Sequence, residues 1–350
     1  MSTITRGNAN VFRVVISSTC CLLVALFMVG FFSGLNKATA ASSYIVAKDG
    51  SGNFTTVQAA INAVPANNTS RVVIYIKNGT YQEVVTVPSN KPFITLYGQS
   101  KTGTIITYNN YASKTKPDGT TYGTTGSASV FIQANDFIAI DVTFQNSHGA
   151  GSQAVAAYVA SDRAYFYDCQ FLGWQDTLFA NSGRQYYRNN YIQGSVDYIF
   201  GDATAVFENS HLNNIAGGSI TAQSRTSSSE TTGYVFINDS ITGTPANSTI
   251  LGRPWRAYAR VVFLTCAMAN DITAVGWNDW GNAANQQTAY FAEYNSTGAG
   301  ANPSGRVSWS HQLTASQAAQ FSVANFLNQD GWLTTAGVYL TSLLKAGFLA

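Results

Sequence analysis

The sequence predicts an all-β protein built as a parallel β-helix with short capping helices at its ends, and three observations lead to this class. Charged residues make up only 10% of the chain, which favours strands and turns over surface helices. Short strand-like blocks recur at steps of roughly 20 to 30 residues, the period of a solenoid. Each block has a β-branched or aromatic centre, then a polar residue, then an apolar residue about three positions later.

The repeats can be aligned with one another. The alignment gives an apolar column and a polar column: Phe171, Ile192, Leu212 and Ile241, then Asp168, Asn189, Asn209 and Asn238. In a β-helix each coil adds a parallel strand about 4.8 Å further along the axis, so equivalent residues stack. A β-sandwich is the alternative, but its strands should alternate more strictly and recur every 8 to 12 residues or so.

Two segments have the pattern of helices that cover the ends of a solenoid. Residues 56–66 (TVQAAINAVPA) form a short amphipathic pattern before the first clear strand. Residues 316–327 (SQAAQFSVANFL) predict a C-terminal helix. Solenoid ends need such caps because they expose an unpaired coil.

Residues 1–40 are typical of a secretory signal peptide. Arg6 and Arg13 precede a long apolar run that ends near Ala38-Thr39-Ala40, and we expect cleavage around Ala40 or Ala41. The alternative is an uncleaved membrane anchor, since the run is about long enough to span a bilayer. Cleavage would leave a secreted, extracellular protein with a single β-helix domain over residues 41–350 and no membrane partner.

The mature chain is nearly neutral. Three of the 19 basic residues and none of the 17 acidic residues lie in the first 40 positions, so 16 basic and 17 acidic residues remain, a net charge of −1. A nucleic-acid-binding protein normally carries a basic patch. We therefore expect no nucleic-acid partner.

Two isolated acids, Asp176 in GWQDTLFA and Asp197 in GSVDYIFG, lie in apolar surroundings. A single aspartate of this kind is usually a turn or cap residue. These two, however, follow the column residues Phe171 and Ile192 by five positions each. They should therefore emerge at the same place on adjacent coils, roughly 5 Å apart. In such a pair one pKa rises and the other stays low.

A cation beside one of these acids would keep it ionised. LGRPW (residues 251–255) supplies Arg253 next to an aromatic residue, and we assign it to Asp197. Taken alone, this segment would be interpreted as a proline-containing turn with a surface arginine.

Five motifs in order resemble the signature segments of the pectin methylesterases: GTYQE (79–83), SQAVA (152–156), GWQDTL, GSVDYIFG and LGRPW. The resemblance extends from about residue 43 to residue 333. It implies a right-handed parallel β-helix that hydrolyses galacturonate methyl esters in pectin without a metal or other cofactor. It also implies methyl-esterified homogalacturonan as substrate, and we expect a monomer that a proteinaceous pectinesterase inhibitor could bind.

The resemblance also implies roles for individual residues. Asp197 would be the nucleophile, and Asp176 the general acid and then the base. Gln175 and Gln153 would donate hydrogen bonds to the oxyanion, with Gln153 also contacting substrate. Arg253 would hold Asp197 and contact the substrate.

Three further residues are assigned to substrate binding on the same basis. Trp255 would pack against a sugar ring. Tyr198 stands where many members carry Phe. Thr124 lies in a stretch (residues 119–130) that matches the family's pattern only loosely.

Three other functions are alternatives to this interpretation. A Ser-His-Asp esterase would need a histidine, and only His148, His211 and His311 exist, with no G-x-S-x-G motif. Of these, His148 could lie near the substrate cleft that the resemblance implies, on the loop before Gln153. A pectin lyase or polygalacturonase is possible on the same scaffold, because fold does not decide chemistry. An inactive carbohydrate-binding β-helix is the third alternative.

The two cysteines of the mature chain, Cys169 and Cys266, occupy the same place in the repeat four coils apart. Four coils correspond to roughly 19 Å. A disulfide needs Cα atoms within about 7 Å of each other. Both thiols should therefore be free and buried in the coil wall.

Overall fold

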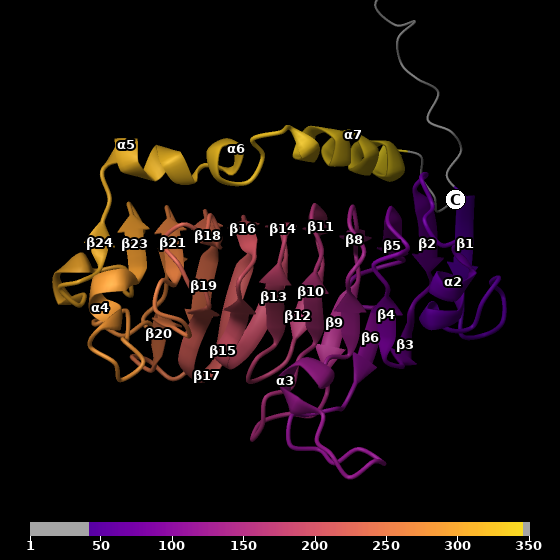
Figure 1. The fold of residues 1–350 in the computed structure, drawn as a ribbon, viewed down its shortest axis with the longest axis horizontal. Helices are drawn as coiled ribbons and strands as arrows, with labels where there is room; N and C mark the ends of the chain where they lie inside the picture. Colours follow the sequence, from indigo (N-terminus) through magenta and orange to yellow (C-terminus); the bar gives the residue numbers. More distant parts are fainter. Residues whose placement is uncertain (1–41, 346–350) are drawn as a thin grey trace, which may run out of the picture. The chain divides into compact units, whose positions relative to one another are not determined.

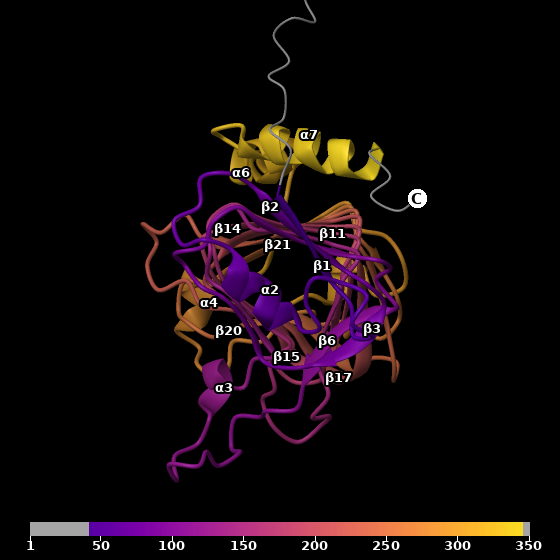
Figure 2. The same cartoon turned by 90° about the vertical axis from the view of Figure 1, so that its right-hand side faces the viewer.

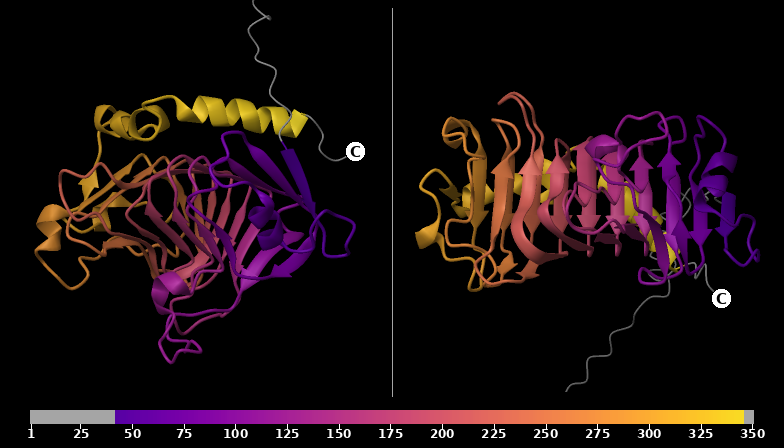
Figure 3. Two further views of the ribbon diagram at one scale, coloured as in Figure 1. Left: turned by 45° about the vertical axis from the view of Figure 1, so that its right-hand side comes forward. Right: turned by 90° about the horizontal axis from the view of Figure 1, so that it is seen from below.

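The computed structural model describes residues 42–345, which form a parallel β-helix (Figure 1). The signal peptide predicted over residues 1–40 lies outside these residues. Every pairing between named strands is parallel, and the coils follow one another along the axis in sequence order (Figure 3). This confirms the expected fold class. No helix within the described range is long and apolar enough to cross a membrane.

Two sheets form the walls of the solenoid. The first sheet contains, in spatial order, β1 (Ser42–Val46), β2 (Val72–Ile76), β5 (Ile94–Gly98), β8 (Ile138–Ile140), β11 (Ala164–Tyr167), β14 (Arg184–Arg188), β16 (Thr204–Glu208), β18 (Gly233–Ile237), β21 (Arg260–Leu264), β23 (Tyr290–Tyr294) and β24 (His311–Gln312). Each strand comes from a different coil, so one coil contributes one rung to this wall.

The second sheet bends so that it supplies the remaining two faces. It contains β3 (Gly79–Gln82), β6 (Thr104–Tyr108), β9 (Thr143–Asn146), β12 (Gln170–Leu172), β15 (Tyr191–Gly201), β13 (Leu178–Ser182), β10 (Ala157–Ala160), β7 (Val130–Ile132) and β4 (Val85–Val87), with β17 (His211–Gln223), β19 (Ser240–Gly243), β20 (Thr249–Pro254) and β22 (Ala267–Met268) attached. The long strand β15 joins the two faces: its first half pairs with β12 and its second half with β13.

The observed register confirms both columns of the sequence alignment. The apolar column is paired from coil to coil and fully buried: Phe171, Ile192, Leu212 and Ile241. The polar column has positive φ angles between 52° and 59°: Asp168, Asn189, Asn209 and Asn238. Asn and Asp tolerate this left-handed conformation better than most residues. Each of these four coils therefore places one of them at the turn between the two sheets, and the next coil has Thr265 there, with a φ angle of 54°.

Aromatic side chains stack along the interior of the first sheet. Neighbouring ring centroids are 4.4 to 4.8 Å apart, with planes within 10° of parallel, along the series Phe166, Tyr187, Phe207, Phe236 and Phe263. This spacing matches the distance between rungs. Burial of these large rings is a main stabilising contribution to the core.

The helices cover parts of the solenoid. They are α2 (Val57–Ala63), α3 (Gly123–Gly126), α4 (Asn285–Thr288), η1 (Pro303–Gly305), α5 (Ala315–Ala318), η2 (Ala319–Phe321), α6 (Val323–Phe326) and α7 (Trp332–Lys345). As expected, α2 covers the first coil, and Thr56 caps it by accepting from the amide of Ala59. The single helix expected over residues 316–327 is instead three short pieces. With α7, which the sequence analysis did not anticipate, they run alongside the first sheet (Figures 1 and 2).

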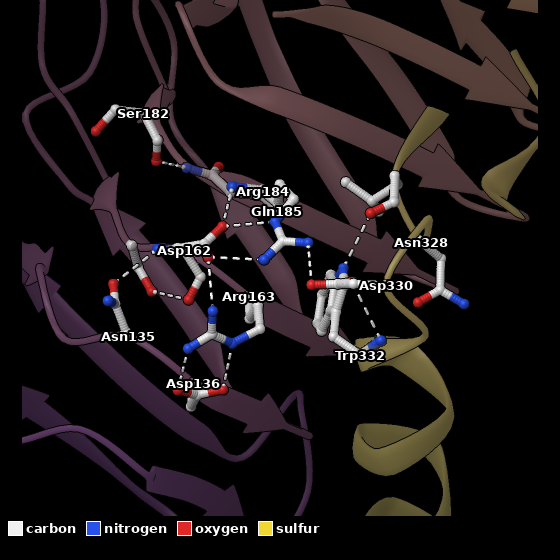
Figure 4. A network of polar contacts seen from close by, with 12 residues as sticks. Asn135, Asp136, Asp162, Arg163, Ser182, Arg184, Gln185, Asn328, Asp330 and Trp332 are labelled. Atoms are coloured by element: carbon white, nitrogen blue, oxygen red, sulfur yellow. Dashed lines mark hydrogen bonds and ion pairs between the residues drawn. The ribbon is translucent and has the colours of Figure 1, made fainter. Parts of the chain in front are cut away.

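An ion-pair network fastens this C-terminal segment to the coils (Figure 4). The carboxylate of Asp162 receives hydrogen bonds from Arg163 and Arg184, with the shortest nitrogen–oxygen distance 2.8 Å in each case. Arg184 also pairs with Asp330 at 2.7 Å, and its guanidinium lies 6.0 Å from the ring of Trp332, the first residue of α7. Arg184, the first residue of β14, thus links the turn before β11 to the start of the last helix.

The two cysteines behave as the sequence predicts. Cys169 and Cys266 precede Gln170 and Ala267, which strand pairing places four rungs apart. Both thiols are buried and free. The expected absence of a disulfide between them is confirmed.

Candidate active site

Asp176 and Asp197 lie in one cleft of about 350 Å³ on the outside of the second sheet. The backbone N–H of Asp176 donates to the carbonyl of Val196 at 3.0 Å, and two residues later Leu178 pairs with Ile199. The two acids therefore occupy equivalent positions on adjacent coils, as their spacing predicts. Both have positive φ angles, 64° and 51° respectively.

The carboxyl of Asp176 is held in its neutral form. Asp176 is only 7% exposed. Among residues 42–345, no side chain or backbone group forms a hydrogen bond or an ion pair with its carboxyl. Burial, and then the charge of Asp197, raise its pKa to about 8, against a smaller lowering by Arg253. At neutral pH this group carries a proton that it can donate.

The carboxylate of Asp197 is held by an arginine. Arg253 donates from Nε to Oδ1 at 2.9 Å and from Nη2 to Oδ2 at 2.7 Å, a bidentate ion pair. The expectation that this pKa stays low was wrong, because burial raises the pKa of Asp197 as well. The hydrogen bonds and charge of Arg253 oppose this rise. Since only Asp197 has the cation as a direct partner, it is the acid that ionises first.

Gln153 and Gln175 line the same cleft. The amide of Ala154 donates to the carbonyl of Gln175 at 3.1 Å, so the two glutamines come from neighbouring coils. Together with the two acids they occupy three consecutive rungs. Neither glutamine side chain has a hydrogen-bond partner within the described part of the chain. Their amide groups are therefore available as donors.

Aromatic rings form the wall beside the acids. Phe179 and Phe200 stack at 4.2 Å, and Trp255 approaches both rings edge-on or tilted, at 6.3 and 5.9 Å. The ring of Trp280 lies 4.0 Å from the guanidinium of Arg253. Phe200, Trp255 and Trp280 all line the cleft.

Sequence reasoning missed two of these residues. Phe200 had a usable signal, because Phe179 and Phe200 each follow the aspartate of their coil by three positions. Trp280 had none, because it lies in an irregular segment between β22 and α4 that belongs to no repeat. Only the folded chain brings it to Arg253.

The structure places Thr124 and Tyr198, both assigned to substrate binding, in different environments. Thr124, in α3, lines the cleft with the two glutamines. Tyr198 does not: its side chain is fully buried in the core, where its hydroxyl donates to Oδ1 of Asn214 at 2.6 Å. The assignment of Tyr198 to substrate binding was therefore wrong. Its side chain points to the inside of the wall, whereas Asp197 points to the outside.

The three histidines do not line the cleft. His148 stacks on Tyr111 with centroids 3.9 Å apart. His211 is hydrogen-bonded through Nε2 to Thr242 at 2.7 Å, and His311 is exposed on β24. A histidine-dependent esterase site is not formed by these residues.

The fold and the cleft define a β-helix protein with paired carboxyls in an aromatic-walled groove. A family model described as Pectinesterase matches residues 43–330, and the chain belongs to this family. Family membership makes it a carboxylic ester hydrolase with pectin methylesterase activity.

Relatives and solved structures agree with this assignment. The chain is 46% identical over 293 residues to "Pectinesterase 31" of Arabidopsis thaliana, covering 81% of this chain and 92% of that protein. It is 42% identical to "Probable pectinesterase/pectinesterase inhibitor 6" of the same plant, covering 87% of this chain and 55% of the relative. Among structures, "Pectin methylesterase from Carrot" superposes with a TM-score of 0.79 at 39% identity, covering 86% and 97% of the two chains. A pectin methylesterase "in complex with hexasaccharide VII" gives 0.71 at 33% identity, covering 83% and 98%.

Proposed function

We propose that this protein hydrolyses the methyl esters of homogalacturonan with Asp197 as nucleophile and Asp176 as general acid and base. One observation carries the assignment of roles. The two carboxyls lie on adjacent coils, but only Asp197 has a bidentate partner, Arg253. The environment thus separates an acid that keeps its proton from one that carries charge.

In the first half-reaction, a carboxylate oxygen of Asp197 attacks the ester carbonyl carbon. The tetrahedral intermediate then collapses, and the departing methoxide takes the proton of Asp176 and leaves as methanol. The product is a mixed anhydride between Asp197 and the galacturonate residue. The raised pKa of Asp176, about 8, supports its role as the proton donor.

In the second half-reaction, the ionised Asp176 takes a proton from water. The resulting hydroxide adds to the galacturonyl carbonyl and releases the carboxylate of Asp197 together with the galacturonic acid group, which loses its proton to solvent. Asp176 is again protonated and Asp197 again charged. The pair therefore returns to its starting state, and water is the only co-reactant.

The amides of Gln153 and Gln175 are proposed to stabilise the negative oxygen of both tetrahedral intermediates. They lie on the two coils before Asp197, with donors that no described residue occupies. Donors fixed before the reaction contribute strongly to such steps. Trp255 and Thr124 are proposed to contact neighbouring sugar rings, since both line the cleft.

We further propose that the protein acts outside the cell after removal of residues 1–40, as a monomer on methyl-esterified homogalacturonan. The apolar N-terminal run supports secretion. We also propose a proteinaceous pectinesterase inhibitor as a partner, supported by the relative "Probable pectinesterase/pectinesterase inhibitor 6", whose name combines the two.

The test is methanol release from highly methylated pectin by the purified mature protein, with reducing ends measured in parallel. Methanol without new reducing ends is the expected result. New reducing ends without methanol would instead assign cleavage of the glycosidic bond. An inverting glycosidase needs its two carboxyls about 6.5 to 9.5 Å apart. This separation is wider than the spacing of adjacent rungs, about 4.8 Å.

A further inference from the structure

The proposed oxyanion donor Gln153 lies on a loop, residues 147–156, that joins β9 to β10 outside both sheets. Two glycines of this loop, Gly149 and Gly151, have φ angles of 92° and 107° and face open space. Glycines in such a loop give the backbone many accessible conformations. Strand pairing does not fix this loop, so other contacts must hold Gln153 in place.

The side chain of Asn146, the last residue of β9, joins the two ends of the loop. Its Oδ1 accepts from the backbone N–H of His148 at 3.0 Å, at the start of the loop. Its Nδ2 donates to the carbonyl of Val155 at 3.0 Å, near the end. Asn146 is only 3% exposed. Water cannot easily replace hydrogen bonds at a buried site, so their loss would leave the partners unpaired.

The same amide also contacts a longer excursion of the chain. Residues 109–127 leave the coil between β6 and β7 and carry α3 (Figure 1). Nδ2 of Asn146 lies 2.9 Å from the carbonyl oxygen of Asn110 and 3.1 Å from that of Ser127, at the two ends of the excursion. An amide nitrogen has two N–H bonds, so three carbonyls share them. Asn146 therefore connects the loop of Gln153 to the excursion.

The excursion holds the backbone around Gln153. The N–H of Ala112 donates to the carbonyl of Gln153 at 2.8 Å. The hydroxyl of Ser127 accepts from the N–H of Val155 at 3.1 Å and donates to the carbonyl of Thr124 at 2.6 Å. The backbone of residues 153–155 is thus fixed from the excursion and from Asn146, while the side chain of Gln153 lines the cleft.

We propose that Asn146 is a positioning residue that holds the amide of Gln153 where the oxyanion forms. This inference rests on the proposed function, in which Gln153 is one of the two donors. A donor stabilises the transition state strongly only when it is fixed before the reaction, and a displacement of about 1 Å can cost on the order of a hundredfold in rate. Asn146 does not line the cleft, so it acts through the backbone that it holds.

The first measurement is methanol release from highly methylated pectin by Asn146→Ala. Its kcat should fall about ten- to a hundredfold, up to the loss expected for one missing oxyanion donor. KM should change less than about threefold, because such a donor acts mainly in the transition state. Ser127→Ala removes one hydroxyl that holds the same segment. It should lower kcat less, and it provides the test if Asn146→Ala does not fold.

Asn190→Ala is the matched control. Asn190 is only 2% exposed, its Oδ1 accepts from the N–H of Cys169 at 2.7 Å, and its Nδ2 donates to the carbonyl of Phe166 at 3.1 Å. It does not line the cleft. Both alanine variants should lower the thermal midpoint, because each leaves buried backbone groups unpaired. Only Asn146→Ala should lower kcat by more than about twofold; equal losses of kcat would show that Asn146 has a structural role alone.

A double-mutant cycle tests whether Asn146 acts through Gln153. In a Gln153→Ala background, Asn146→Ala should lower kcat by less than about twofold further, because the donor that it positions is gone. Retention of the full loss in that background would overturn the positioning role.

Hydrogen exchange of residues 147–156 gives a readout that does not depend on activity. It should be faster in Asn146→Ala than in the wild type and in Asn190→Ala, because the loop opens more often. Unchanged exchange would show that Asn146 does not hold the loop and would overturn the inference. A wild-type kcat for Gln153→Ala alone would instead refute the donor role of Gln153 in the proposed function.

Discussion

Asp176 and Asp197 occupy the same position on adjacent coils, and both adopt a left-handed backbone, with φ angles of 64° and 51°. Non-glycine residues in this region cost on the order of 1 kcal/mol or more each, and such residues cluster at functional sites. Here the bend lifts each carboxyl out of the coil wall into the cleft. The stacked coils hold the conformation, since the amide of Asp176 is bonded to the next rung.

Replacement of the proposed nucleophile should abolish activity without unfolding the protein. In Asp197→Asn the side chain keeps its shape and one acceptor for Arg253, but it cannot attack the ester. We expect methanol release to fall to background, with a thermal midpoint within a few degrees of the wild type. Turnover close to that of the wild type would rule out a covalent intermediate at Asp197.

Loss of an oxyanion donor should slow the reaction and leave the fold intact. Gln175→Ala should lower kcat by about a hundredfold or more, because its amide has no structural partner among the described residues. Gln320→Ala, at an exposed glutamine of η2, is the matched control and should change kcat less than twofold. Equal rates for the two variants would remove Gln175 from the mechanism.

The stability of the protein should depend on pH through Asp176. Its folded-state pKa, about 8, lies above the value of about 3.9 expected in the unfolded chain. The native state therefore loses stability as the pH rises from about 4 through 8, while the buried group becomes charged. Asp176→Asn cannot ionise and should escape this loss.

Thermal unfolding of both proteins between pH 4 and pH 9 checks this expectation. The midpoints should be similar at pH 4, and the variant should be more stable at pH 9 by on the order of 2 kcal/mol or more, because each pKa unit corresponds to about 1.4 kcal/mol. Parallel curves over the whole range would show that Asp176 is not a raised, buried acid.

Removal of the arginine should move the acid limb of the rate profile. Arg253 lowers the pKa of Asp197 by hydrogen bonding and by its charge. In Arg253→Ala the carboxylate is harder to form, so the pH below which kcat/KM falls should shift upward. Arg253→Lys should shift it less, because a charge remains. An active Arg253→Ala variant with an unmoved acid limb would contradict the ion pair's role.

The coil count predicts two reactive thiols after unfolding. Cys169 and Cys266 are free and lie four rungs apart. Thiol titration in denaturant without reductant should therefore find two sulfhydryls per mature chain. A peptide that links the two cysteines in mass spectrometry would contradict the register on which the pairing of Asp176 and Asp197 also depends.

The repeated pattern of the sequence determined the fold and the pairing of the acids. Inward-facing apolar residues must stack in a solenoid, so the column of Phe171 and Ile192 set the register of both coils. Once this register is known, equal spacing from the column places Asp176 beside Asp197. The asparagines and aspartates of the polar column follow from the same constraint, because each coil needs a left-handed residue at the same turn.

The tertiary structure decided which way individual side chains face and which charges meet. Tyr198 points into the core although it follows the proposed nucleophile, and Trp280 reaches Arg253 from a segment outside the repeats. Burial raised the pKa of Asp197 despite its cation. These features depend on desolvation and on contacts between residues far apart in the chain, neither of which a local sequence pattern encodes.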